Sequence, residues 1–109
     1  MRMPQAYIIG PYTSPDPDHL LDNVRSALAV ALKAAVAGYL PIVPHTMGNH
    51  RVSTWDDAME RCRYLIRGLD PRQDVVILSP HWEESRGSRE EVVLAQFLSI
   101  RIIDHKELS

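Results

Sequence analysis

The sequence predicts a small three-layer αβα protein of the doubly wound, Rossmann- or flavodoxin-like kind, with a parallel sheet of four or five strands. Short apolar segments alternate with longer segments whose apolar residues recur every three or four positions, which gives the order βαβαβαβ. The strand segments are apolar on both faces, as parallel strands are when helices cover both sides of the sheet. The 109 residues fit a single domain, 1–109.

The first strand is predicted at residues 6–9 and the first helix at about 19–37. Residues 10–18 between them contain three prolines, a glycine and two aspartates, a composition typical of a loop. Asp18 is a plausible N-cap of the helix, and Gly38 is the residue expected to end it with a positive φ. The helix has an apolar stripe and is rich in alanine, which favours close packing on a sheet.

The remaining elements continue the alternation. Residues 39–43 are predicted as a strand at the edge of the sheet, because they include Pro41. Ser53 or Thr54 can cap a second helix, whose apolar stripe starts at Trp55 and includes Cys62. Residues 74–78 are the clearest strand, and a helix at about 88–98 and a strand at 100–103 complete the chain.

Composition excludes several classes of protein. The net charge of −2 leaves no basic excess to bind nucleic acid polymers or membrane surfaces. The single cysteine, Cys62, excludes an internal disulfide framework and favours a reducing compartment. No apolar run approaches the roughly 20 residues of a membrane span, and the N-terminal apolar stretch is too short for a signal peptide. We therefore expect a cytoplasmic protein that does not contact a membrane.

Three loops follow the carboxyl ends of the predicted strands, where ligands bind in this fold class: residues 10–18, 44–52 and 79–87. In the third loop, Ser85, Gly87 and Ser88 precede a helix whose first N–H groups favour an anion. A purely structural alternative is a capping box formed by Ser88 and Glu91. Placed in the first turn of the helix, Glu91 is expected to be ionised by the helix dipole, so it is a candidate nucleophile.

The first loop supplies further candidates. Gly10 permits a sharp turn or a close approach to a ligand, together with Pro11. Tyr12 can stack on a base, and Tyr7 lies on the preceding strand. The alternative is that Tyr7 packs in the core and Tyr12 lies on a surface loop. In the second loop, His45 is expected to line the pocket.

Neither a metal site nor a cofactor is predicted. His45, His50 and Cys62 lack the spacing of known metal-binding motifs. Cys62 lies on an apolar stripe, and no helix start or loop activates it as a nucleophile, so we interpret it as a core residue.

The chain resembles the nucleoside 2-deoxyribosyltransferase-like superfamily, in particular its small bacterial and phage members. The resemblance covers nearly the whole chain and rests on the segments YIIGPY, GYLPIVPH and QDVVILSPHWEESRGSREE. Its most specific element is Ser85-x-Gly87-x-x-x-Glu91 after the third strand. The resemblance implies cleavage or transfer of an N-glycosidic bond, with Glu91 as the nucleophile and Tyr7 as the family's tyrosine.

Two positions refine this expectation. The family's deoxyribosyltransferases tend to have a carboxylate six residues before the glutamate, whereas the related 2′-deoxynucleoside 5′-monophosphate N-hydrolases have a phosphate-binding serine. Here that residue is Ser85, which implies a nucleoside 5′-monophosphate as the substrate. The family's aspartate on the preceding helix aligns with Cys62, which departs from the pattern. The alternative function is therefore a non-catalytic module that binds or senses nucleotides.

A homo-oligomer, at least a dimer, is also expected. A domain of this length has a small core, and its alanine-rich first helix offers a flat surface to a partner. The family also tends to assemble as dimers or larger oligomers. We expect Trp55 or Trp82 to be partly buried by a neighbouring subunit.

Overall fold

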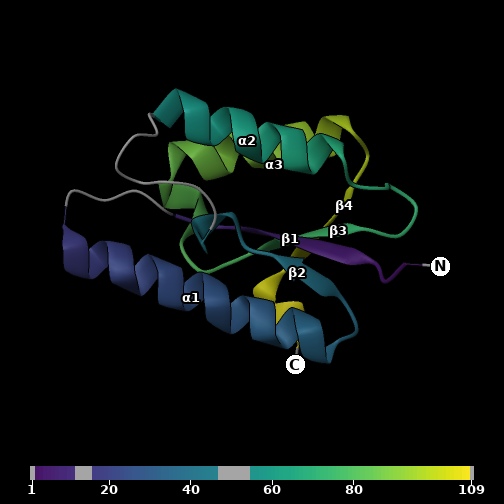
Figure 1. The fold of residues 1–109 in the computed structure, drawn as a ribbon, viewed down its shortest axis with the longest axis horizontal. Helices are drawn as coiled ribbons and strands as arrows, with labels where there is room; N and C mark the ends of the chain where they lie inside the picture. The colour runs from purple at the N-terminus through teal and green to yellow at the C-terminus, as the bar shows by residue number, and fades with distance from the viewer. Residues whose placement is uncertain (1, 12–15, 47–54, 109) are drawn as a thin grey trace.

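The computed structural model describes residues 2–11, 16–46 and 55–108, which form an all-parallel sheet of four strands between two layers of helices (Figure 1). The strands are β1 (Gln5–Ile9), β2 (Leu40–Ile42), β3 (Val75–Leu78) and β4 (Arg101–Asp104). Their spatial order is β2-β1-β3-β4, so β1 and β3 are central and β2 lies at an edge, as predicted. The predicted fold class is confirmed.

The three helices divide between the two faces of the sheet. Helix α1 (Pro17–Val36) covers one face, whereas α2 (Trp55–Arg67) and α3 (Arg86–Phe97) cover the other (Figure 1). Alternate residues of β1 join two separate cores, since successive side chains of a strand point to opposite faces. Ile8 packs with the alanines of α1, and Tyr7 packs on the side of α2 and α3.

The strand order creates a switch point between β1 and β3. The chain leaves β1 toward β2 on one side, while β3 pairs with β1 on the other side. The two strands end in register, with Ile9 opposite Leu78, so the loops that follow them start side by side. In parallel α/β sheets this crevice at the carboxyl edge is where ligands bind.

The start of α1 differs from the prediction. Its N-cap is Asp16, whose Oδ1 accepts a hydrogen bond from the N–H of Asp18 at 3.0 Å, so Asp18 is not the cap. The helix begins earlier because Pro17 occupies its first position, where the missing N–H and the fixed φ of proline cost nothing. Gly38 follows the helix with φ +100°, as expected.

A buried carboxylate holds the amino edge of the sheet. Asp74, just before β3, accepts hydrogen bonds from both Nη atoms of Arg2, at 2.7 and 2.9 Å. It also accepts the N–H groups of Gln5 at 2.7 Å and Asp70 at 2.6 Å. One side chain therefore joins the start of β1 to the turn before β3.

Within the ranges that the structure describes, no helix is long and apolar enough to cross a membrane. Trp82, one of the two residues expected at a subunit contact, packs against the core between the sheet and α3 within its own chain.

Candidate functional site

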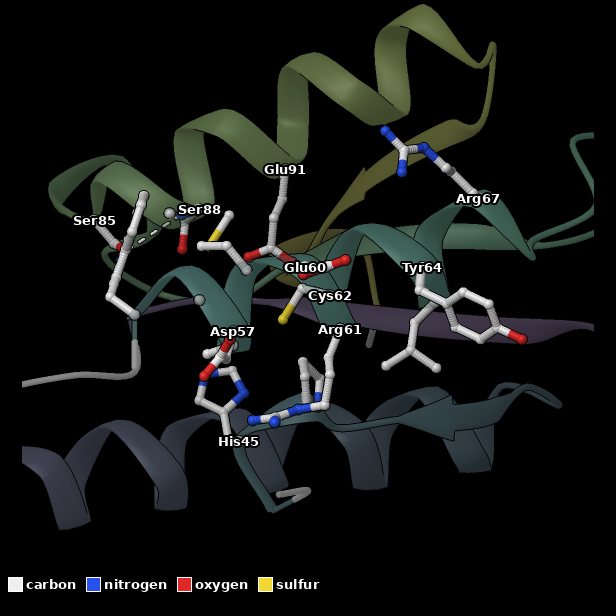
Figure 2. A pocket seen from close by; sticks show the side chains of 17 residues that line it. His45, Asp57, Glu60, Arg61, Cys62, Tyr64, Arg67, Ser85, Ser88 and Glu91 are labelled. Atoms are coloured by element: carbon white, nitrogen blue, oxygen red, sulfur yellow. Dashed lines mark hydrogen bonds between the residues drawn. The ribbon is translucent and has the colours of Figure 1, made fainter. Parts of the chain in front are cut away.

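A cleft of about 740 Å³ opens at the carboxyl edge of the sheet, between α2, the start of α3 and the ends of β1 and β2 (Figure 2). It brings together six of the residues singled out in the sequence: Gly10, His45, Ser85, Gly87, Ser88 and Glu91. Residues from three predicted loops thus meet at one edge, as expected. Tyr12 and His50 lie outside the described residues.

Glu91 and Tyr7 form a buried pair beneath the cleft. Tyr7 has no exposed surface, and its hydroxyl donates a hydrogen bond to Oε2 of Glu91, which is 7% exposed. Glu91 extends from α3 toward the sheet (Figure 2). The tyrosine reaches it because the side chain of the central residue of β1 points to the α2 and α3 side. The core interpretation of Tyr7 is therefore confirmed, and the same buried side chain is also a partner of Glu91.

The charge state of Glu91 differs from the expectation. Burial raises its pKa from 4.5 to about 7, although the hydrogen bond from Tyr7 and the charge of Arg63 lower it. Glu91 lies in the second turn of α3, because the helix starts at Arg86. Loss of hydration therefore outweighs the helix dipole, and the carboxylate is partly protonated near neutral pH.

Stability should depend on this group. The pKa of this carboxyl is higher in the folded than in the unfolded chain. Its ionisation therefore destabilises the fold as the pH rises from the pKa of the unfolded chain to the pKa of the folded chain. We expect wild-type protein to lose about 3 kcal/mol between pH 4.5 and 7 from Glu91. Glu91→Gln should lack this loss and should melt higher than wild type at pH 8, with little difference at pH 4.5.

Thermal melting at several pH values measures this difference. Glu90→Gln is the matched control, because Glu90 is its neighbour on α3 and pairs at the surface with Arg86 at 3.2 Å. The control should show no comparable gain at pH 8. Parallel melting curves for wild type and Glu91→Gln across this pH range would contradict the buried, raised-pKa carboxyl.

Cys62 extends from α2 on the same side of the cleft as Glu91 (Figure 2), and its thiol interacts with both Tyr7 and Glu91. Burial and the negative charge of Glu91 raise the pKa of its thiol to about 11. Burial and the same charge raise the pKa of Tyr7 well above its ordinary value. At neutral pH the thiol and the phenol are therefore neutral, and Glu91 is the group of the three that titrates there.

The N-cap of α3 is not Ser88, as the capping-box alternative requires. Ser85 is the N-cap, and its Oγ accepts the N–H of Ser88 at 3.3 Å (Figure 2). Ser88 is therefore inside the helix, and Glu91 turns toward Tyr7 instead of back to the cap. The capping box is wrong because the helix starts earlier than its apolar pattern indicates.

The hydroxyl of Ser88 is unsatisfied. Ser88 is 1% exposed, and its Oγ has no hydrogen-bond partner among the residues that the structure describes. A buried polar group without a partner is unfavourable unless a ligand or water supplies one. Because Ser88 lines the cleft, this donor is available to a bound molecule.

Gly87 and Gly10 are required by close packing. A Cβ on Gly87 would lie 3.0 Å from Sδ of Met59, so this glycine lets α3 approach α2. A Cβ on Gly10 would lie 1.9 Å from Oγ of Ser79, which itself donates to the carbonyl of Ile9 at 2.7 Å. The chain after β1 is thus held against the start of the loop after β3.

His45 and Pro11 contribute to the same support. Nε2 of His45 donates to the carbonyl of Pro11 at 3.1 Å. Burial lowers the pKa of His45. Hydrogen bonds to the backbone of Pro11 and Gly10 act in the opposite direction but are weaker, so the pKa stays below its ordinary value. A neutral, buried imidazole therefore fixes the backbone of the first loop, while its edge lines the cleft.

None of the residues predicted to bind the substrate or to catalyse the reaction belongs to α2, although this helix lines the cleft. Asp57, Glu60 and Arg61 line the cleft, and the guanidinium of Arg86 lies 4.7 Å from the centre of the Trp55 ring. The order of the elements could have indicated these residues, because α2 begins at the same edge of the sheet as the candidate loops. Within residues 2–11, 16–46 and 55–108, no three or more His, Cys, Asp or Glu residues are grouped to hold a metal ion.

Comparison with known families adds one finding. Residues 4–104 match the profile of a family described as a domain of unknown function, DUF4406. The chain belongs to this family. The match extends across this DUF4406 domain from β1 to β4, and it includes the cleft and the Tyr7–Glu91 pair. A search of curated proteins found no match.

Proposed function

We propose that this DUF4406 domain cleaves or transfers the N-glycosidic bond of a nucleoside or a nucleoside 5′-monophosphate. One observation carries the proposal: Glu91 lies at the buried end of a cleft at the ligand-binding edge of the sheet, hydrogen-bonded by Tyr7. A buried carboxyl with a raised pKa, set in a cleft, is typical of an active site. The resemblance to nucleoside 2-deoxyribosyltransferase-like enzymes also assigns catalysis to Glu91 and Tyr7.

Glu91 acts as the nucleophile in this mechanism. Its carboxylate attacks C1′ of the sugar, the C1′–N bond breaks, and the base leaves with the electron pair of that bond. The resulting glycosyl ester is then cleaved by water, or by the nitrogen of a second base if the reaction is a transfer. With a pKa of about 7, roughly half of Glu91 is ionised at neutral pH. Tyr7 orients the attacking carboxylate through its hydrogen bond.

The leaving base requires a proton. The thiol of Cys62 has a pKa of about 11 and is a poor donor at neutral pH. Asp57 and Glu60 also line the cleft and supply carboxyl groups from α2, one or both of which can serve the base. A general acid contributes about 10²- to 10⁴-fold to such a step. The acid in this mechanism therefore comes from α2 but is not Cys62.

The 5′-phosphate binds at the start of α3. The unsatisfied hydroxyl of Ser88 donates to a phosphate oxygen, and the N–H groups of the first turn add the favourable end of the helix dipole. Ser85 supports this site as the N-cap. The two serines differ, because the hydroxyl of Ser85 caps the helix by accepting the N–H of Ser88, whereas the hydroxyl of Ser88 has no partner among the described residues.

Substitution should separate these roles. Ser88→Ala should raise the Kd of a nucleoside 5′-monophosphate by about 10- to 150-fold, the loss of one hydrogen bond to a charged group. Binding of the matching nucleoside and the melting temperature should change little. Ser85→Ala should instead destabilise the fold by about 1 kcal/mol through the lost cap. Calorimetric titration with each monophosphate and its nucleoside measures the effect, and equal losses for both ligands would contradict the phosphate role.

Chromatographic detection of free base tests the proposed activity. Wild-type protein is incubated with nucleosides, 2′-deoxynucleosides and their 5′-monophosphates, with and without a second base. Release without a second base indicates hydrolysis, and a new nucleoside indicates transfer. Cys62 in place of the family's aspartate favours one second candidate, a non-catalytic nucleotide sensor. Melting temperatures that rise with nucleotide while no base is released would support that second function.

A further inference from the structure

Helix α1 carries its largest apolar side chains on the surface that faces away from the sheet. Toward the core it presents Val30 and small residues, Ala27, Ala31 and Ala34. Outward it presents an exposed stripe, defined here as Leu21, Leu28, Leu32 and Val36, which are 46%, 46%, 68% and 80% exposed. The spacings of seven, four and four place these residues on one side of the helix. A row of leucines of this kind marks an interaction surface.

We propose that the exposed stripe of α1 pairs with the same stripe of a second copy, with the two helices antiparallel about a two-fold axis. The charges on α1 favour this partner. Asp18 and Asp22 are exposed near its start and Lys33 is exposed near its end, while Arg25 lies between them. An antiparallel pair sets Asp18 and Asp22 of each helix toward Lys33 of the other, whereas a parallel pair opposes like charges.

The two-fold arrangement fixes which residues meet. Leu21 and Val36 lie at the two ends of the stripe, so each faces the other across the axis. Leu28, close to the midpoint, faces its own copy. Asp22 of one copy then lies within about one turn of Lys33 of its partner. The macrodipoles of the two helices also run in opposite directions, which is the favourable sense.

The size of the contact predicts a weak dimer. A helix of 20 residues is about 30 Å long. A contact of one helix on one helix buries less than the roughly 800 Å² per partner of a standard interface. We therefore expect dissociation in the micromolar range. Because α1 lies on the opposite face of the sheet from α2 and α3, pairing leaves the cleft open and does not depend on the proposed function (Figure 1).

Sedimentation equilibrium at increasing concentration tests the dimer. The average mass should rise from 12.4 kDa toward twice that value in wild type. Leu28→Glu should remain monomeric at every concentration, because Leu28 faces its own copy and the two new carboxylates would oppose each other. Phe97→Glu is the matched control, because Phe97 is 84% exposed on α3, and it should follow the wild-type curve. A constant mass of 12.4 kDa for wild type, or a Leu28→Glu variant that still dimerises, would overturn the proposal.

Charge exchange and cross-linking test the orientation. Asp22→Lys and Lys33→Asp should each weaken the dimer, and the double variant should restore it. In a Cys62→Ser background, oxidation should cross-link Leu28→Cys with itself, and Leu21→Cys only when mixed with Val36→Cys. Efficient cross-linking of Leu21→Cys with itself would indicate a parallel pair and overturn the antiparallel arrangement, as would no cross-link at position 28.

Discussion

Glu91→Gln should abolish base release, with a loss of at least about 10³-fold in kcat, while the Kd of the nucleotide stays nearly unchanged. The amide has almost the same volume and can still accept the hydrogen bond from Tyr7, so the cleft keeps its shape. It lacks the negative charge that makes the carboxylate nucleophilic, and it cannot form a glycosyl ester. Single-turnover base release and titration of the nucleotide measure the two quantities separately.

The neighbouring glutamate provides the control. Glu90 pairs at the surface with Arg86 at 3.2 Å and Arg63 at 3.5 Å, so Glu90→Gln should keep wild-type kcat. Activity in wild type should also rise with pH through about 7, as Glu91 loses its proton, and level off above that value. Unchanged base release in Glu91→Gln would reject the nucleophile and the glycosidase mechanism together.

Asp74→Ala should lower the free energy of unfolding by about 2–4 kcal/mol at neutral pH, since it leaves the N–H groups of Gln5 and Asp70 and the guanidinium of Arg2 without their acceptor. In a chain of this length such a loss corresponds to a melting temperature lower by roughly 10–20 °C. Chemical denaturation at pH 7 measures it. Asp104→Ala, which removes a partly exposed cap of the N–H of Lys106, should cost much less.

The pH dependence of Asp74 has the opposite sign to that of Glu91. Burial would raise the pKa of Asp74, but hydrogen bonds from Arg2 and two backbone N–H groups hold it below its usual 3.8. The stability that Asp74 contributes is therefore fully present above pH 3.8, and it is lost as the pH falls through the lower pKa of the folded state. The stability difference between wild type and Asp74→Ala should shrink below about pH 4. A constant difference down to acid unfolding would contradict an ionised Asp74.

Much of the fold was predictable because its causes are local. The strand at 75–78 and the edge strand with Pro41 can be recognised from a few consecutive residues. Helix starts were less predictable, because the cap at Asp16 depends on a proline that also suits a loop. The cap at Ser85 lies three residues before Ser88, where the capping-box spacing to Glu91 suggested the cap. Both helices therefore begin earlier than predicted.

The residues of the site were predictable as a set, but their interactions were not. The rule for parallel sheets places Gly10, His45 and Ser85 at one edge without any knowledge of side-chain contacts. The state of Glu91 depends on burial, which arises only when α3 packs over β1 and Tyr7. The contribution of α2 depends on how that helix lies over the sheet edge. Such long-range packing cannot be predicted from the spacing of residues along the chain.

The contact between Gly10 and Ser79 constrains the order in which this domain can change during evolution. Any side chain at position 10 places an atom 1.9 Å from Oγ of Ser79, but 3.2 Å from its Cβ. An alanine at position 10 would force the Ser79 hydroxyl to rotate and to give up its hydrogen bond to the carbonyl of Ile9. Earlier loss of that hydroxyl would reduce the overlap to a tight contact with Cβ. Positions 10 and 79 are therefore coupled, so the cost of a change at one depends on the residue at the other, even though 69 positions separate them in the sequence.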